Sequence, residues 1–298
     1  MLVLLLAICA SIIGLVAYLR FRKTSTADLV ARLPAGDAVI LYIDFAALRQ
    51  AGILELFAGS DVVQEPEYRA FVSESGFDYQ RDLDSALVSF HRDGVFFLLR
   101  GRFDWSSLNQ YTTRQGGLCH NSFCRVAGST PERKISFFPV EPNLMALAVA
   151  KDSWAASLLS ARKPDRMQPA IPNQPVWSFI PASVLKKADT LPPGARLFAG
   201  VLEGADQIVL SLGPQGYRME LLLDVACRSP QDAAVLVSQL EKVTSLLRES
   251  IARENRQPNP RDLSGLLTGG VFTQQDRRVL GRWPVERVFL EALAGGTR

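Results

Sequence analysis

An uninterrupted uncharged stretch at the start of the chain places the strongest constraint on what it can fold into. Residues 2–19 read LVLLLAICASIIGLVAYL and contain no acidic or basic side chain. At about 1.5 Å per residue, this stretch forms a helix of roughly 27 Å, close to the hydrocarbon thickness of a bilayer. The sequence therefore predicts a transmembrane helix. We expect it to be retained as an anchor, because no small-residue cleavage site follows it.

Basic residues follow this stretch directly. Arg20, Arg22 and Lys23 are the only charged side chains in residues 1–23, and they are placed to meet anionic lipid headgroups. We therefore predict a membrane anchor with a basic flank over residues 1–23, with membrane lipid as the partner of the helix. The whole chain has 33 basic and 30 acidic residues, so removing these three leaves a balanced body. That balance gives no support for nucleic-acid binding.

The side of the membrane on which the body lies has two interpretations. The positive-inside rule places the body in the cytoplasm, as a cytoplasm-facing membrane-anchored interaction domain. The cysteines favour the opposite side, because Cys119 and Cys124 are spaced to face each other across a hairpin and form a disulfide. Disulfides persist in oxidising compartments. We predict a single-pass membrane protein with an extracytoplasmic body, periplasmic or at the cell surface, and keep the cytoplasmic orientation as the alternative.

A proline-rich segment divides the body. Residues 162–175 read RKPDRMQPAIPNQP, and the four prolines exclude a helix interior or a central strand. We interpret this segment as a linker. It separates a first unit, residues 24–161, from a second unit, residues 176–298.

The two units repeat one order of elements: strand, helix, hairpin, helix and strand. In the first unit, Asp93-Gly94 supplies a tight hairpin turn, and Asp104 is typical of a helix N-cap. In the second, residues 213–216 supply the turn and Ser229 begins a long amphipathic helix. This order is that of the split βαβ motif. The predicted fold class is α+β, with an N-terminal transmembrane helix followed by two tandem ferredoxin-like units.

Catalytic motifs are scarce. The chain contains no phosphate-binding P-loop, no Gly-x-Ser-x-Gly elbow and no His-Glu-x-x-His metal helix. The spacing Ser-x-x-Lys occurs at Ser160–Lys163 and at Ser183–Lys186. Serine acyl enzymes use this spacing, because one helical turn places the amine beside the hydroxyl, but their other two motifs are absent here. An envelope serine hydrolase using Ser183 and Lys186 is therefore the alternative function.

Residues able to hold a metal or act as a general base are also few. His91 and His120 are the only histidines, and no further pair completes four ligands around the two hairpin cysteines. The acidic turn containing Asp82 lacks the glycine and terminal glutamate of a calcium loop. We therefore predict no cofactor, no metal site and no catalytic residue.

Several segments carry a resemblance. These are the stretch LPAGDA at residues 33–38, the strand after it, the segment RGRFDW at residues 100–105 and the hairpin with its two cysteines. Over the anchor and the first half, the chain resembles uncharacterised bacterial membrane-anchored cell-envelope proteins. The resemblance implies an envelope location and no catalytic residues. We predict a non-enzymatic binding or scaffolding role in the cell envelope, with a protein or a lipid surface as partner.

Overall fold

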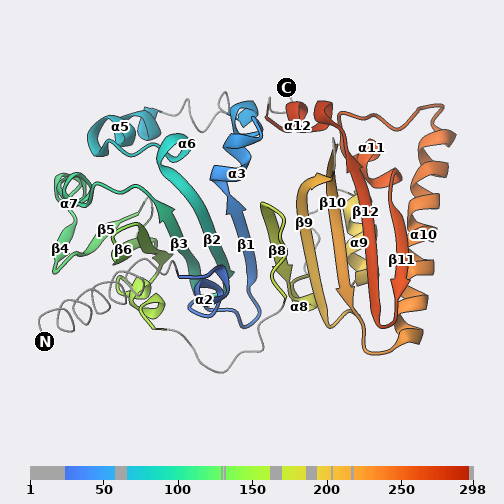
Figure 1. Cartoon of the computed structure of the whole chain (residues 1–298), viewed down its shortest axis with the longest axis horizontal. Helices are drawn as coiled ribbons and strands as arrows, with labels where there is room; N and C mark the ends of the chain where they lie inside the picture. Colours follow the sequence, from blue (N-terminus) through green and yellow to red (C-terminus); the bar gives the residue numbers. More distant parts are fainter. Residues whose placement is uncertain are drawn as a thin grey trace, which may run out of the picture.

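One antiparallel sheet of twelve strands runs through the molecule from end to end (Figure 1). Its strands lie in the order β11-β12-β10-β9-β8-β1-β2-β3-β7-β6-β5-β4, and each strand is antiparallel to its neighbours. The structure is a computed structural model, and it describes residues 24–57, 66–128, 130, 132–161, 170–185, 193–202, 204–215 and 218–294.

The strands fall into two halves along the chain. The first half contributes β1 (Val39–Asp44), β2 (Leu83–His91), β3 (Gly94–Gly101), β4 (Leu118–His120), β5 (Phe123–Ala127), β6 (Lys134–Glu141) and β7 (Leu144–Ala150). The second half contributes β8 (Val176–Ile180), β9 (Gln207–Gln215), β10 (Arg218–Ala226), β11 (Val271–Gln275) and β12 (Arg278–Val285).

Helices lie on the faces and at the ends of this sheet. Those of the first half are α2 (Thr26–Val30), α3 (Phe45–Gln50), η1 (Leu54–Phe57), α5 (Pro66–Ser75), α6 (Tyr79–Asp82), α7 (Trp105–Arg114) and η2 (Ala155–Leu159). Those of the second half are α8 (Ala182–Leu185), α9 (Pro193–Leu202), α10 (Pro230–Arg253), α11 (Leu263–Thr268) and α12 (Arg287–Ala294).

Local sequence accounts for the hairpins and the helix ends. The turn between β2 and β3 ends at Gly94, whose φ is 152°. A side chain there would approach the carbonyl oxygen of Val149 to 2.6 Å, so glycine is required. At the start of α10, the backbone N–H of Asp232 donates to the hydroxyl of Ser229 at 3.0 Å, and Pro230 occupies the first turn. Both features favour a helix start.

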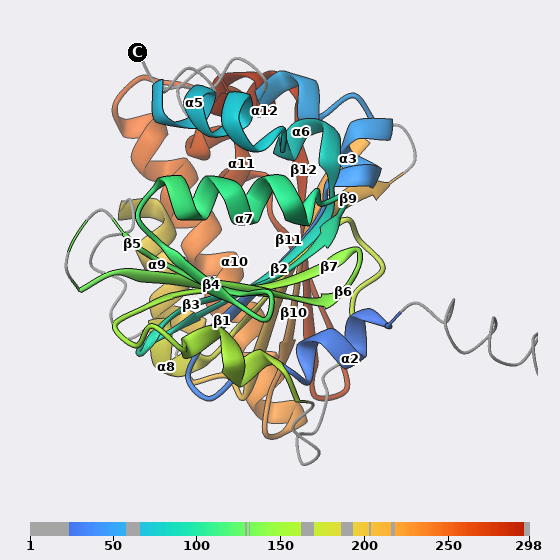
Figure 2. The same cartoon turned by 90° about the vertical axis from the view of Figure 1, so that its left-hand side faces the viewer.

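Both faces of the sheet are covered in the first half. On one face, Leu29 of α2 and Leu159 of η2 pack into a buried cluster with Leu87 of β2. On the other face, Phe71 of α5 and Leu108 of α7 pack against the strands. Figure 2 shows α5 and α7 above these strands and α2 below them. The first half is therefore a sheet between two layers of helix.

The second half is covered on one face. Phe198 of α9, Leu240 of α10 and Leu266 of α11 pack against Leu223 and Val225 of β10. In Figure 1, α9 is seen behind β10 and β12, and none of the described helices crosses in front of these strands. The front of the second half is therefore a sheet face that the described helices leave uncovered.

This topology corrects the predicted fold class. Two tandem ferredoxin-like units would each close around a sheet of their own, whereas β8 pairs with β1, with Phe179 opposite Ile40. The two halves are thereby joined in one large antiparallel sheet. The order of elements along the chain does not specify which strands become neighbours, because strand pairing is decided by contacts far apart in the sequence.

The predicted membrane anchor is also corrected. Residues 2–19 and the flank Arg20, Arg22 and Lys23 lie outside the described residues. In the part of the chain that the structure describes, every helix is too short or too polar to cross a bilayer. Even α10, with 24 residues, carries a single buried stripe with charged residues around it, so it packs on the sheet. The prediction of a single-pass anchor therefore has no supporting helix among the described residues.

Candidate functional site

The uncovered sheet face of the second half forms the floor of the candidate site, which we call the open face. Since side chains alternate between the two faces of a strand, every second residue of four strands points to this side. They are Val209 and Ser211 of β9, Glu220, Leu222 and Asp224 of β10, Thr273 and Gln275 of β11, and Arg278, Leu280 and Arg282 of β12. The floor therefore mixes apolar, polar and charged side chains.

A cavity of about 1000 Å³ lies over this floor. One wall is the segment leading into β8, which contributes Ala170, Ile171, Pro172 and Gln174. Gln174 packs closely on Gly213 of β9, where an added Cβ atom would meet the Gln174 side chain at 2.9 Å. Ile171 and Val209 also contact the buried cluster of the first half. The cavity thus begins where the double-sided packing of the first half ends.

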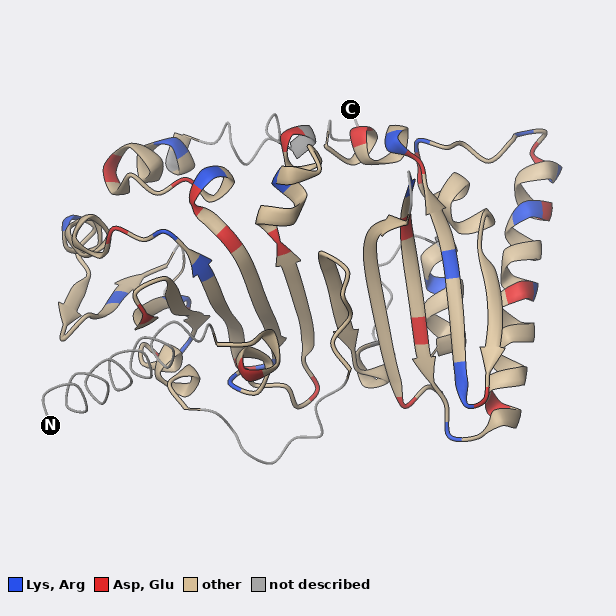
Figure 3. Ribbon diagram, in the orientation of Figure 1, with Lys and Arg blue, Asp and Glu red and all other residues tan. Residues whose placement is uncertain are grey.

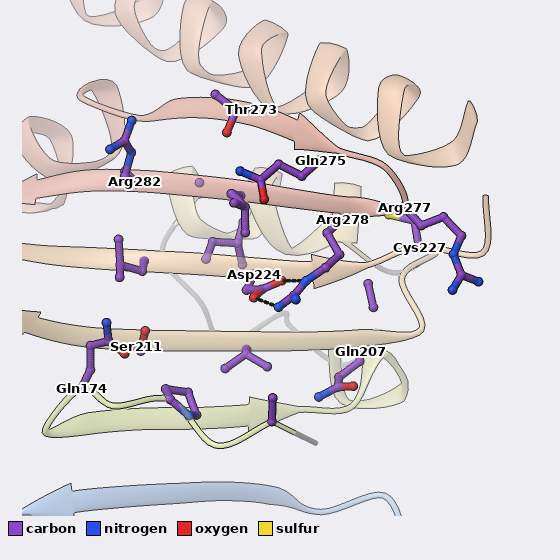
Figure 4. Close-up of a pocket in the computed structure, with 18 of the residues that line it drawn as sticks. Gln174, Gln207, Ser211, Asp224, Cys227, Thr273, Gln275, Arg277, Arg278 and Arg282 are labelled. Atoms are coloured by element: carbon purple, nitrogen blue, oxygen red, sulfur yellow. Dashed lines mark hydrogen bonds and ion pairs between the residues drawn. The ribbon is translucent and has the colours of Figure 1, made fainter. Parts of the chain in front are cut away.

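An ion pair lies in the middle of the floor. The Nε atom of Arg278 donates to Oδ1 of Asp224 at 2.9 Å, and Nη2 of the same guanidinium donates to Oδ2 (Figure 4). Bidentate pairs of this kind fix both side chains in place. The hydrogen bond to Asp224 raises the pKa of Arg278 above its ordinary value. The two side chains satisfy each other's hydrogen bonds, and their opposite charges offer little net charge to a ligand.

The other charged side chains of the cavity nearly balance. Glu220 and Arg282 lie on the floor, and Figure 4 shows Arg282 well away from the Arg278–Asp224 pair. The full set of charged lining residues is Asp206, Glu220, Asp224, Asp276, Arg277, Arg278 and Arg282. Figure 3 shows acidic positions on β10 and basic positions on β12, side by side. The open face is therefore of mixed charge, neither strongly basic nor strongly acidic.

Cys227 lies at one end of the cavity. Burial raises the pKa of its thiol, and the nearby carboxylates of Asp232 and Asp206 raise it further. A thiol with a raised pKa stays protonated at neutral pH and is a poor nucleophile or metal ligand. Within the described residues, no three His, Cys, Asp or Glu side chains gather to hold a metal ion. The arrangement suits binding better than catalysis.

The two cysteines singled out in the sequence lie at the opposite end of the sheet. Cys119 of β4 and Cys124 of β5 form a disulfide, with their Cα atoms 4.1 Å apart. They face each other directly in the hairpin register. The turn between them holds Asn121 and Ser122 at φ angles of 47° and 64°, which suits a two-residue hairpin. The disulfide therefore cross-links β4 and β5 at the outer edge of the first half.

The residues of the alternative hydrolase are not brought together as a catalytic pair. The Ser183 hydroxyl is exposed on α8 and donates to Oδ1 of Asp37 at 3.1 Å, while Lys186 lies outside the described residues. The Ser160 hydroxyl donates to the carbonyl oxygen of Ser157 at 2.7 Å, and Lys163 also lies outside the described residues. Nothing in the described geometry activates either hydroxyl.

The remaining sequence candidates have structural partners or lie on the surface. Nδ1 of His91 lies 3.3 Å from a carboxylate oxygen of Asp93, in the turn after β2. His120 is exposed in β4. Asp82 accepts a hydrogen bond from Nη2 of Arg81 at 2.7 Å. His91 and Asp82 therefore have local partners, and none of the three residues lines the cavity over the open face.

Sequence reasoning missed Glu220 and Arg282. Alternation along residues 217–225 identifies one apolar face of this strand, and the charged residues between the apolar ones mark the other. That signal shows which side chains leave the core. It does not show that three further strands and a connecting segment enclose them in a cavity.

Comparison with known proteins finds similarity of fold only. No family model and no curated protein matches the chain. Crystal form I of TP0453 matches with a TM-score of 0.53 and 13% identity, covering 92% of this chain and 97% of that one. Form III gives 0.52 and 13%, over 92% and 100%. Form IV gives 0.51 and 12%, over 90% and 95%. The chain therefore shares its overall fold with TP0453 along nearly its whole length.

Proposed function

We propose that this is a non-catalytic binding protein, which holds an extended segment of a protein partner on the open face. The observation that carries the proposal is the unequal covering of one continuous sheet. The described helices cover both faces of the first half and only one face of the second. The uncovered face lies under a cavity of about 1000 Å³, at the upper end of the usual size range for ligand sites.

The floor of the cavity suits a polypeptide. Val209, Leu222 and Leu280 supply apolar contact area at its centre, and each is only partly buried. Polar side chains surround them, so a partner can replace the hydrogen bonds to water that it gives up on binding. A pocket for an acyl chain would instead be lined mostly by apolar side chains.

The charge of the cavity disfavours an anionic membrane surface as the partner. Binding to anionic headgroups is driven by clusters of lysine and arginine. The cavity is lined by four acidic and three basic residues, and two of these seven form the Arg278–Asp224 pair. Such a surface favours a partner that carries both signs of charge, as polypeptides commonly do.

The disulfide supports a location outside the cytoplasm. Cys119 and Cys124 are joined at the edge of the sheet, and structural disulfides are typical of oxidising compartments. The proposal therefore places the binding protein in such a compartment, and the membrane anchor has no part in it.

Peptide binding tests the proposal. The probes are fluorescent acetylated hexapeptides built from lysine, aspartate, valine and threonine in every order, screened by fluorescence anisotropy. We expect a subset to bind, and the variant Leu222→Lys to lower their affinity about tenfold or more, because it places a charge at the apolar centre of the floor. The matched control is Leu246→Lys, at a residue of α10 that is 46% exposed.

Two results would contradict the proposed function. One is that no peptide in the set binds the unmodified protein. The other is that Leu222→Lys and Leu246→Lys change affinity equally, which would place binding elsewhere on the molecule. Circular dichroism of both variants checks that they retain the fold.

A further inference from the structure

The open face contains two carboxylate–arginine pairs in the same register. Asp224 lies opposite Leu280, and Arg278 is two residues before Leu280 on β12. Four residues earlier on β10, Glu220 lies opposite Pro284, and Arg282 is again two residues before it. In both cases a carboxylate of β10 and an arginine of β12 are therefore diagonal neighbours on the same side of the sheet.

The two pairs differ in whether the carboxylate and the arginine are hydrogen-bonded to each other. Arg278 and Asp224 are joined by two hydrogen bonds, and we call them the closed pair. Oε2 of Glu220 is shielded from solvent and has no hydrogen-bond partner among the described residues. Arg282 is exposed, and within the described part of the chain it forms no ion pair or side-chain hydrogen bond. We call Glu220 and Arg282 the open pair.

A shielded carboxylate oxygen without a partner is unfavourable, because it has lost its hydration and gained no hydrogen bond. Glu220 lies beside Gly213 in the register, where Gln174 packs on the strand and closes that end of the cavity. Both members of the open pair line the cavity. Since Glu220 as a whole is only partly buried, rotation about its side-chain bonds can present the carboxylate to a ligand that also accepts from Arg282.

We propose that the open pair is the anchor for the bound segment. Glu220 accepts hydrogen bonds from the ammonium or guanidinium group of a basic side chain of the partner. Arg282 donates to a neighbouring carboxylate or carbonyl oxygen of the same segment. Leu222, which lies opposite Arg282 in the register, contacts the alkyl stem of the basic side chain. This anchor rests on the proposed function, since it names the chemistry that the open face selects.

The same hexapeptide set tests the anchor. For peptides that contain lysine, we expect Glu220→Gln to lower affinity about tenfold, because hydrogen bonds between charged partners are the stronger ones. Peptides without lysine should bind the variant as they bind the unmodified protein. The matched control is Glu241→Gln, at an exposed residue of α10 on the other face of the sheet, and it should leave lysine selectivity within about twofold. Asp224→Asn makes the corresponding change in the closed pair, and it should lower affinity for lysine peptides less than Glu220→Gln does.

The outcomes separate the anchor from the proposed function. Peptides that bind, lose affinity with Leu222→Lys and show no preference for lysine would overturn the anchor and leave the function standing. A lysine preference that Asp224→Asn abolishes and Glu220→Gln does not would also overturn the anchor. Absence of any peptide binding would overturn both.

A second measurement asks whether the open pair closes on itself in solution. Thermal unfolding of Glu220→Gln, Arg282→Gln and the double variant gives their coupling without ligand. We expect the shifts in Tm to add, whereas Asp224→Asn and Arg278→Gln should be coupled. Coupling of the open pair as large as that of the closed pair would overturn the proposal, since Arg282 would then already satisfy Glu220.

Discussion

The first and second halves of the sheet are built from the same kind of strand but buried to different degrees. At the junction, Trp177 of β8 is 1% exposed and stacks on Tyr42 of β1, with ring centroids 5.1 Å apart. On the same face one strand further, Val209 is only partly buried, and the floor of the cavity begins with it. One sheet face therefore changes from buried core to open face within a few strands.

This comparison shows that the composition of a sheet face changes together with its covering by helices. The covered face of the first half presents apolar side chains such as Leu87 and Leu98, whereas apolar and charged side chains alternate on the open face. In the first half, α2 and η2 bury one of those faces, and in the second half none of the described helices does so. Variants in the two regions test whether their side chains also differ in what they contribute to the free energy of unfolding.

The largest expected effect is the loss of Trp177. Trp177→Ala should lower the free energy of unfolding by about 3–5 kcal/mol, because it removes a large buried ring and leaves a cavity. Leu280→Ala on the open face should cost less than about 1.5 kcal/mol, since its side chain is already partly in water. Urea unfolding followed by circular dichroism measures both. Equal losses of unfolding free energy in the two variants would show that the open face is part of the core. The two halves would then not differ in burial as proposed.

A smaller effect is expected from the disulfide at the edge of the first half. Replacing Cys119 and Cys124 together by serine should cost about 2 kcal/mol, as expected for a short closed loop. Peptide binding at the open face should not change, because β4 and β9 lie at separate places in the strand order. Urea unfolding with and without reductant measures the cost in the unmodified protein. Loss of peptide binding on reduction would show that the two regions are coupled.

The smallest effect concerns the acid stability of the first half. The hydrogen bond from Arg81 lowers the pKa of Asp82 below its ordinary value, and the backbone N–H of Asp78 lowers it further. Because the folded pKa is depressed, the contribution of Asp82 is fully present above pH about 4 and is lost as the pH falls through the folded pKa. We expect Asp82→Asn to cost about 1–2 kcal/mol at pH 7.

Unfolding measured between pH 2 and 7 checks this expectation. The variant Asp82→Asn should show a flatter loss of stability below pH about 4 than the unmodified protein. The matched control is Asp276→Asn, in the exposed turn between β11 and β12. If both variants keep the acid dependence of the unmodified protein, the Asp82 interaction contributes nothing to the stability of the first half.

Local features of the fold could be predicted from the sequence because neighbouring residues decide them. The serine and proline at the start of α10 cap the helix as their types predict. The spacing of Cys119 and Cys124 brings them opposite each other once the turn between them forms. The alternation in β10 separates Leu223, which is buried, from Asp224, which is not. In each case the cause lies within a few residues.

The pairing of strands and the covering of sheet faces by helices could not be predicted from neighbouring residues. Nothing local to β8 shows that it pairs with β1, and this pairing replaces two separate units by one sheet. The candidate site depends on the same long-range choice. Glu220 and Arg282 are ordinary charged residues in the sequence, and they become a candidate anchor only where β10 and β12 are neighbours under a shared cavity.

The sequence by itself determined the strands, the helix caps, the hairpin with its disulfide spacing and the balanced charge of the body. These follow from backbone preferences and from side-chain alternation, which act over short distances along the chain. The tertiary structure decided that the halves share one sheet and that the described helices leave one face of the second half uncovered. Those outcomes depend on which apolar surfaces pack together, and packing energy is shared among residues far apart in the sequence.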